Sequence, residues 1–152
     1  MRPMGYVIIQ MVLLALLAAA LVAGGKPLLP TPVMLAAPAF LAAAAILVAA
    51  AVAAVGRHLR VQPAPGPAAP LVTHGVYRRF RHPMYTAVVL AVGGLFLLRS
   101  TLLVGVVAAV IVGFLHLKAR YEEVLLAAHH PDYAAYRRRT WGIIPGWPYR
   151  SG

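Results

Sequence analysis

A chain of 152 residues of which 62% are hydrophobic and 11% charged, with a mean hydropathy of +0.81, lies outside the range of ordinary soluble domains. In a soluble domain its formal charge of +11 would favour a nucleic-acid partner, but here the basic residues flank long apolar stretches, so no nucleic-acid partner is predicted. The chain has no cysteine, which excludes disulfides and thiolate metal sites.

Two long uncharged stretches occupy most of residues 1–60. Residues 5–25 carry only Gln10 as a clearly polar side chain, and residues 33–55 carry no charge. Each has the ~20 residues that a helix needs to cross a ~30 Å hydrocarbon core. A secretory signal peptide is the alternative for the N-terminus, but this apolar run is longer than a signal core and three more follow it. We therefore predict two transmembrane helices that act as anchor and packing partners.

The next segment, VQPAPGPAAP at residues 61–70, contains four prolines and one glycine. Proline fixes φ and has no backbone N–H, so this composition predicts an extended, semi-rigid connector rather than a helix. The connector separates the anchor region 1–60 from a catalytic region 61–152, which holds nearly all the side chains capable of chemistry.

Two shorter apolar runs, residues 84–98 and 102–117, are separated by the tripeptide RST and predict a helical hairpin. Gly93 and Gly94 lie in the middle of the first run, where two small residues allow another helix to approach closely. Together with the two N-terminal spans, the hairpin predicts about four transmembrane helices.

The last span is predicted to continue as one helix beyond the membrane, because no helix breaker occurs before Pro131. A short helix over residues 132–139 is expected to follow. The predicted fold class is therefore an all-α, polytopic membrane protein with a C-terminal helical hairpin and a cytoplasmic helical tail.

The basic residues are distributed unevenly between the two sides of the predicted membrane. With a cytoplasmic N-terminus, twelve of the fourteen lysines and arginines lie on the cytoplasmic side, and only Lys26 and Arg99 lie outside. This asymmetry predicts a multi-pass protein with both termini in the cytoplasm. Membrane lipids are expected partners, and the run of Arg137, Arg138 and Arg139 is interpreted as facing anionic headgroups.

The segment VYRRFRHPMY, residues 76–85, lies at the cytoplasmic start of the third span. Pro83 suits the first helical turn, where its missing N–H leaves no bond unmade. Arg81 and His82 then lie at the positive end of a helix dipole, which favours a carboxylate or phosphate ligand. The simpler interpretation of both residues is a cap and headgroup anchor.

All three acids of the chain follow the fourth span closely, on the same predicted side of the membrane. Glu122 and Glu123 offer acceptors for an ammonium group or ribose hydroxyls, and Tyr77 and Tyr85 offer aromatic faces for a cation or a purine ring. An i,i+4 surface pair of Glu122 with Lys118 is the simpler interpretation of that glutamate. No metal site is predicted, because the sequence has no cysteine and no helical His–x–x–x–His pair.

Four motifs occur in a fixed order: G-V-Y, R-H-P-x-Y, E-E-x-x-L and Y-x-x-Y followed by a proline. The stretches that carry them, LVTHGVYRRFRHPMYTA, KARYEEVLL and PDYAAYRRRTWGIIPG, resemble the integral-membrane methyltransferases typified by isoprenylcysteine carboxyl methyltransferase. They resemble phospholipid N-methyltransferases more distantly. The resemblance covers roughly residues 62–146. It implies an enzyme that uses S-adenosyl-L-methionine to methylate a lipophilic acceptor.

The resemblance also implies which residues form the site, leaving open which glutamate contacts the cofactor. Tyr85 and Arg120 match positions near the reacting group of the acceptor and are the expected catalytic residues. The expected cofactor-binding residues are Gln62, Ala69, Pro70, Leu71, Val72, Tyr77, Arg81, His82, Glu122 and Glu123.

Two other functions remain alternatives. Sterol reductases have a similar C-terminal region with an H-P-x-Y element and a terminal PG, and they use NADPH; the Glu122–Glu123 pair and the short chain favour the methyltransferase. A non-enzymatic protein that binds anionic lipid would require only the positive charge.

The sequence does not decide the acceptor among a prenylated cysteine, a phospholipid amine, a quinone-like lipid and a small thiol. No oligomeric state is predicted. A carboxylate acceptor needs no general base, whereas an amine would need His82 or a glutamate.

Overall fold

The computed structural model of the protein describes residues 3–56 and 71–145, and every regular element in these ranges is helical. This confirms the predicted all-α class. In chain order the elements are α1 (Pro3–Ala23), α2 (Thr31–Met34), α3 (Ala37–Val55), the 3₁₀-helix η2 (Gly75–Arg78), α4 (Pro83–Arg99), α5 (Leu102–His129) and α6 (Tyr133–Arg139).

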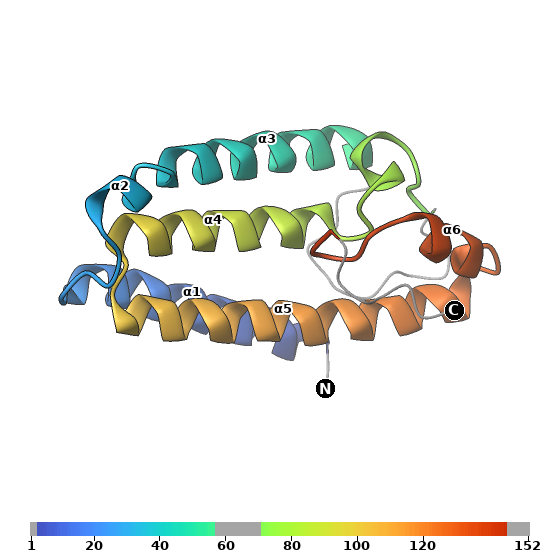
Figure 1. Ribbon diagram of the computed structural model, residues 1–152. Coiled ribbons are helices and arrows are strands. Elements are labelled where there is room, and N and C mark those ends of the chain that lie inside the picture. Colours follow the sequence, from blue (N-terminus) through green and yellow to red (C-terminus); the bar gives the residue numbers. More distant parts are fainter. Residues whose placement is uncertain (1–2, 57–70, 146–152) are drawn as a thin grey trace.

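The long helices run side by side along one axis (Figure 1). In this arrangement α4 packs between α3 and α5, and α1 packs against α5. Three helices, α1, α5 and the stretch that contains α2 and α3, are long and apolar enough to cross a membrane, and α4 is a shorter apolar helix. Large apolar side chains such as Ile8, Val22 and Ile46 are exposed on the outside of the bundle, as expected for surfaces that face lipid. The protein is a multi-pass integral membrane protein.

Gly94 marks the close approach of α4 to α3 that the sequence predicts. A Cβ atom at Gly94 would lie 3.0 Å from Leu41 Cγ and 3.1 Å from Phe40 Cβ, both on α3. Those distances are shorter than ordinary carbon–carbon contacts of 3.5–4.0 Å. A larger residue at this position would therefore require Leu41 and Phe40 to shift by a few tenths of an ångström.

The two loops at one end of the bundle are bonded to each other. Ser100 takes a left-handed conformation (φ 35°) between α4 and α5, and the Thr101 side chain caps α5 by accepting a hydrogen bond from the Val104 N–H. The backbone N–H of Leu28, in the loop after α1, donates to the Ser100 carbonyl at 2.6 Å. Hence the α1–α2 loop and the hairpin turn share one end of the bundle, whereas α6 lies at the other (Figure 1).

The prediction of one continuous helix over residues 33–55 is wrong at its start. The structure divides the stretch into α2 and α3, with a turn at Leu35 and Ala36. Pro38 has no N–H to donate to the carbonyl of Met34, and its ring crowds that carbonyl, so the helix is interrupted there. By contrast, α5 continues to His129 as predicted, and the short helix after Pro131 is α6.

We propose that the end with Lys26 and Arg99 faces outward, because that orientation satisfies the positive-inside rule. Lys26 and Arg139 are both exposed, and they lie at opposite ends of the bundle. In intact cells, Lys26→Cys is expected to react with a membrane-impermeant thiol reagent, whereas Arg139→Cys is expected to react only after permeabilisation. The natural chain has no cysteine, so it serves as the negative control for labelling. If Arg139→Cys reacted in intact cells and Lys26→Cys did not, the proposed orientation would be wrong.

Candidate active site

The segment after α6 folds back and pairs with the residues just before α4. The backbone N–H of Arg81 donates to the Trp141 carbonyl, and the N–H of Trp141 donates to the Arg79 carbonyl, both at 2.8 Å. The Trp141 indole also packs edge-on against Phe80, with ring centroids 5.7 Å apart. Farther along, the Thr86 hydroxyl donates to the Ile143 carbonyl at 2.6 Å. These contacts hold the C-terminal segment against the first turn of α4.

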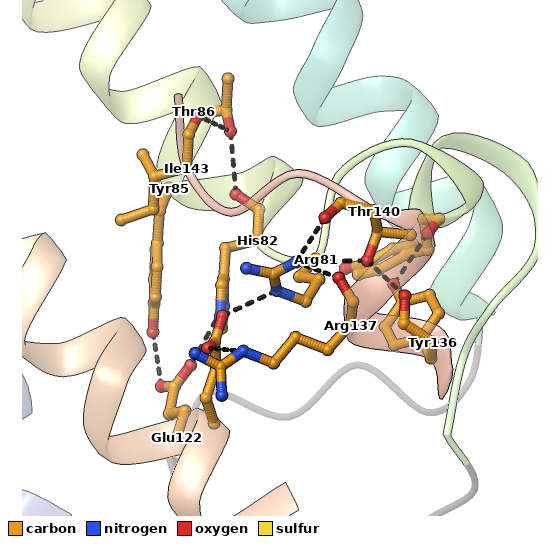
Figure 2. Close-up of polar contacts among 11 residues, drawn as sticks. Arg81, His82, Tyr85, Thr86, Glu122, Tyr136, Arg137, Thr140 and Ile143 are labelled. Atoms are coloured by element: carbon orange, nitrogen blue, oxygen red, sulfur yellow. Dashed lines mark hydrogen bonds and ion pairs between the residues drawn. The ribbon is translucent and has the colours of Figure 1, made fainter. Parts of the chain in front are cut away.

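Arg81 is buried beneath this segment and connects three elements (Figure 2). Its Nε donates to Glu123 Oε1 of α5 at 2.8 Å, and its Nη1 donates to the Arg137 carbonyl of α6 at 2.9 Å. Nη1 also donates to the carbonyl of Thr140. A guanidinium with 1% of its side chain exposed requires a counter-charge, and Glu123 supplies it.

Glu123 is the centre of a buried charge cluster. Besides Arg81, its Oε1 lies 3.3 Å from Nε2 of His82, and its Oε2 lies 3.6 Å from Nε of Arg137. With 8% of its side chain exposed, this carboxylate has little contact with water. Its Oε1 is therefore held by Arg81 and His82 and its Oε2 faces the charge of Arg137, which indicates a positioning role for Glu123.

Glu122 is held differently. Its Oε1 accepts a hydrogen bond of 2.5 Å from the Tyr85 hydroxyl, and its Oε2 lies 3.7 Å from Nδ1 of His82. The His82 and Tyr85 rings are nearly parallel, with an interplanar angle of 6° and centroids 5.4 Å apart. Figure 2 shows Tyr85 and His82 extending from the start of α4 toward Glu122 of α5. The imidazole thus joins the two carboxylates into one network.

Tyr77 belongs to η2, which lies beside the cluster. Its backbone carbonyl accepts a hydrogen bond from the Tyr136 hydroxyl of α6 at 2.7 Å, which fixes η2 against α6. Burial, and secondarily the negative charge of Glu122, raises the pKa of the Tyr77 phenol above its ordinary value. The phenol therefore stays neutral and can donate a hydrogen bond at physiological pH.

Besides Arg137 Nε, which faces Glu123 Oε2 at 3.6 Å, two buried donors near the cluster have no hydrogen-bond partner among the described residues. One is Nη2 of Arg81, and the other is the hydroxyl of Tyr133 on α6. Burial raises the pKa of Tyr133, so its hydroxyl keeps the proton. A buried donor without an acceptor is energetically unfavourable, which makes both groups candidates for contact with a ligand.

The structure thus brings together six of the predicted site residues, which are Tyr77, Arg81, His82, Tyr85, Glu122 and Glu123. Leu71 and Val72 are partly buried in the segment before η2. Arg120 is exposed on α5, and no hydrogen bond or ion pair within the described residues joins it to the cluster. Its catalytic role stays a prediction. Three further predicted residues lie outside the described ranges: Gln62, Ala69 and Pro70.

The interpretation of the arginine run as wholly lipid-facing is wrong for Arg137. Arg138 and Arg139 are exposed, but Arg137 points its Nε at Glu123 and offers its carbonyl to Arg81. The helical repeat explains the difference, because three consecutive residues on a helix are about 100° apart and cannot share one face. The position of α6 determines which of the three meets the cluster.

Lys118 is also placed otherwise than expected. It is only 5% exposed rather than on the surface, and its Nζ donates to Gln10 Oε1 of α1 at 2.9 Å. No ion pair within the described part of the chain joins Lys118 to Glu122. The sequence offered one signal for this contact, since Gln10 is the only amide side chain in an otherwise apolar helix.

The sequence matches the family model of isoprenylcysteine carboxyl methyltransferase over residues 34–128, which is more than half of the chain. The chain belongs to the isoprenylcysteine carboxyl methyltransferase (ICMT) family. Comparison with curated proteins gives no match, and comparison with solved structures gives none either.

The ICMT match includes both halves of the charge cluster, the motif with Arg81, His82 and Tyr85 and the motif with the two glutamates. Enzymes of the ICMT family are methyltransferases that use S-adenosylmethionine as methyl donor. The match does not include α1 or α6, although both contribute side chains that contact the cluster or its neighbours. These two helices complete the site from outside the matched region.

Proposed function

We propose that this protein transfers the methyl group of S-adenosylmethionine to a lipophilic or membrane-associated acceptor at the end of the bundle where α4, α5 and α6 meet. The observation that carries the proposal is the buried network of Arg81, His82, Tyr85 and two carboxylates within the region matched by the ICMT family. A protein that only anchors to anionic lipid has no use for buried carboxylates.

The residues present fit the donor. S-adenosylmethionine carries a carboxylate and an ammonium group at one end and a ribose and a purine at the other. Arg81 Nη2 and the Tyr133 hydroxyl are buried donors that suit the carboxylate or a ribose oxygen. The half-buried ring of Tyr77 offers a face for the purine.

Of the two glutamates, we assign Glu122 to cofactor contact and Glu123 to support. Glu123 is engaged by Arg81, His82 and Arg137, so its negative charge is already compensated. Glu122 has one hydrogen bond, to Tyr85, and its other oxygen lies 3.7 Å from His82. A carboxylate oxygen accepts more than one hydrogen bond, so Glu122 keeps the capacity to bind an ammonium group or ribose hydroxyls.

The protein's contribution to such a reaction is positioning. When bound, the cofactor supplies an electrophilic methyl group on a sulfonium, whose sulfur leaves as a neutral thioether. Tyr85 is held by Glu122 and stacked on His82, so it can set the distance between donor and acceptor. The C-terminal segment that covers Arg81 limits water around the charges, which strengthens their interactions.

Isothermal titration of the purified protein with S-adenosylmethionine, S-adenosylhomocysteine and NADPH tests the proposal. Both sulfur ligands are expected to bind and to compete, and NADPH is not expected to bind. Binding of NADPH alone would favour a membrane reductase. Binding of none of the three, together with tight binding to anionic vesicles, would favour a non-enzymatic lipid-binding protein.

A further inference from the structure

Lys118 joins α1 to the start of α4. It is buried on α5, and a buried lysine on a membrane-spanning helix is unfavourable unless it has a partner or a function. Its Nζ donates a hydrogen bond to Gln10 Oε1 of α1 at 2.9 Å. The same Nζ lies 5.1 Å from the centroid of the Tyr85 ring, within the range of a cation–π contact. A chain of contacts therefore connects Gln10 to Tyr85 through one ammonium group.

The Tyr85 side chain has three contacts that fix its direction. Its hydroxyl donates to Glu122 Oε1 at 2.5 Å, its ring stacks on the His82 ring, and the Lys118 ammonium lies over its ring. Glu122 and His82 belong to the buried charge network, whereas Lys118 takes part in no ion pair within the described residues. Lys118 is thus the contact of Tyr85 whose position the network does not determine.

Gln10 determines where this ammonium lies. A lysine has a flexible four-carbon stem, and of the two contacts of Lys118 the hydrogen bond to the amide is the directional one. Gln10 is the only amide side chain in α1, and an amide in a membrane span is stabilised by a partner on a neighbouring helix. Without the amide oxygen, the ammonium is free to leave the Tyr85 ring.

A second contact fixes the face of α1 that carries Gln10. Tyr6 of α1 stacks on Tyr121 of α5, with ring centroids 5.1 Å apart and an interplanar angle of 24°. Gln10 follows Tyr6 by four residues, so the two share one face of α1. Lys118 precedes Tyr121 by three residues, which likewise places both on one face of α5. Two contacts one helical turn apart set the rotation of α1, so that the amide faces Lys118 rather than lipid.

We infer that Gln10 is a positioning residue for the reaction: through Lys118 it holds the Tyr85 ring in place, which makes α1 part of the catalytic unit rather than only an anchor. The inference rests on the proposed function, in which Tyr85 sets the distance between the methyl donor and the acceptor. Gln10 contacts neither ligand and acts through Lys118 alone. It lies outside the region that matches the ICMT family model, so the match assigns it no role.

The position of Tyr85 can be followed in the full-length protein in detergent by replacing this residue with 3-fluorotyrosine and recording its fluorine NMR signal. Gln10→Leu is expected to shift the signal by more than its line width, because the ammonium leaves the ring. Gln10→Glu keeps an acceptor oxygen at the same reach and is expected to return the signal toward its natural position. An unchanged signal in Gln10→Leu would overturn the inference.

Tyr6→Leu is the matched control. It removes a contact between the same two helices one turn away and leaves Lys118 and its amide partner in place. The Tyr85 signal is expected to keep its position in this variant. Equal shifts in Tyr6→Leu and Gln10→Leu would show that Gln10 only helps α1 to pack, and the inference would be wrong. Should Gln10→Leu not fold, Gln10→Asn, whose amide is one carbon shorter, replaces it.

Transfer of a radiolabelled methyl group from S-adenosylmethionine to N-acetyl-S-farnesylcysteine measures the effect on the reaction. In Gln10→Leu, kcat is expected to fall by about two- to thirtyfold, the range for the loss of one cation–π contact. The KM for S-adenosylmethionine is expected to stay unchanged, whereas a damaged fold would change both constants. Gln10→Glu is expected to recover most of the rate. A natural kcat in Gln10→Leu would contradict the positioning role.

Titration of the same samples with S-adenosylhomocysteine separates this inference from the proposed function. If the natural protein binds no S-adenosylhomocysteine but the Tyr85 signal depends on Gln10, the contact chain from α1 to Tyr85 stands and methyl transfer is the proposal that falls. If the natural protein binds S-adenosylhomocysteine but the signal does not depend on Gln10, methyl transfer stands and the role of Gln10 falls.

Discussion

Glu123→Gln is expected to destabilise the protein more than a change at any neighbouring polar position. The substitution leaves Arg81 buried with no counter-charge, and it also removes the charge that faces His82 and Arg137. Removing one partner of a buried ion pair costs about 3–5 kcal/mol. For a chain of this size a loss of 1 kcal/mol lowers the melting temperature by about 2–4 °C, so a decrease on the order of 10 °C is expected.

Thermal unfolding of purified protein in detergent, followed by tryptophan fluorescence and by aggregation, measures this effect. Glu122→Gln is the matched control, because it changes the adjacent residue in the same way. Its amide oxygen can still accept the hydrogen bond from Tyr85, and no arginine loses its partner, so a much smaller decrease is expected. Equal melting temperatures for Glu123→Gln and the natural protein would show that the cluster around Arg81 does not stabilise the fold.

Glu122→Gln is expected instead to weaken the binding of S-adenosylhomocysteine by about ten- to a hundredfold. It removes a negative charge that we assign to cofactor contact, and a hydrogen bond to a charged group is worth about 1.5–3 kcal/mol. His82→Ala is expected to cause a loss of the same order, because His82 contacts both glutamates. Isothermal titration measures both effects, and the melting temperature of each variant shows whether the fold is intact.

The control for this second prediction removes exposed positive charge. The double variant Arg138→Ala/Arg139→Ala is expected to keep its affinity for S-adenosylhomocysteine within about twofold, because exposed charges contribute little to a site that they do not contact. Arg137 is left unchanged in this control, since it contacts Glu123. Equal losses in the double variant and in Glu122→Gln would favour a surface that binds anions by bulk charge.

Much of the site could be predicted because its two polar motifs have fixed positions relative to the spans. Pro83 begins α4, so the residues before it must lie at that end of the bundle. Likewise, α5 continues from the membrane without a breaker, so Glu122 and Glu123 must lie at the same end. The local sequence therefore predicts that both motifs lie at the same end of the bundle. The resemblance to a family predicts which of their side chains form the site.

The pairing within the site could not be predicted, because it depends on how each helix is rotated about its axis. Glu122 and Glu123 are adjacent in sequence, yet one bonds Tyr85 and the other Arg81. The directions of neighbouring helical residues differ by about 100°, so a small rotation of α5 would exchange their partners. The same reason accounts for Arg137, whose position in α6 gives no sign of whether it faces lipid or protein.

By itself, the sequence determined the helices, the membrane and the end of the bundle where polar groups gather. Hydropathy, proline positions and charge are local properties, and each acts within one or two helical turns. Only the tertiary structure decided that Gln10 meets Lys118 across 108 residues and that the C-terminal segment covers Arg81. These contacts depend on which helices are neighbours and on which faces they bury, and in a chain with apolar residues on all sides of its spans no hydrophobic periodicity specifies those faces.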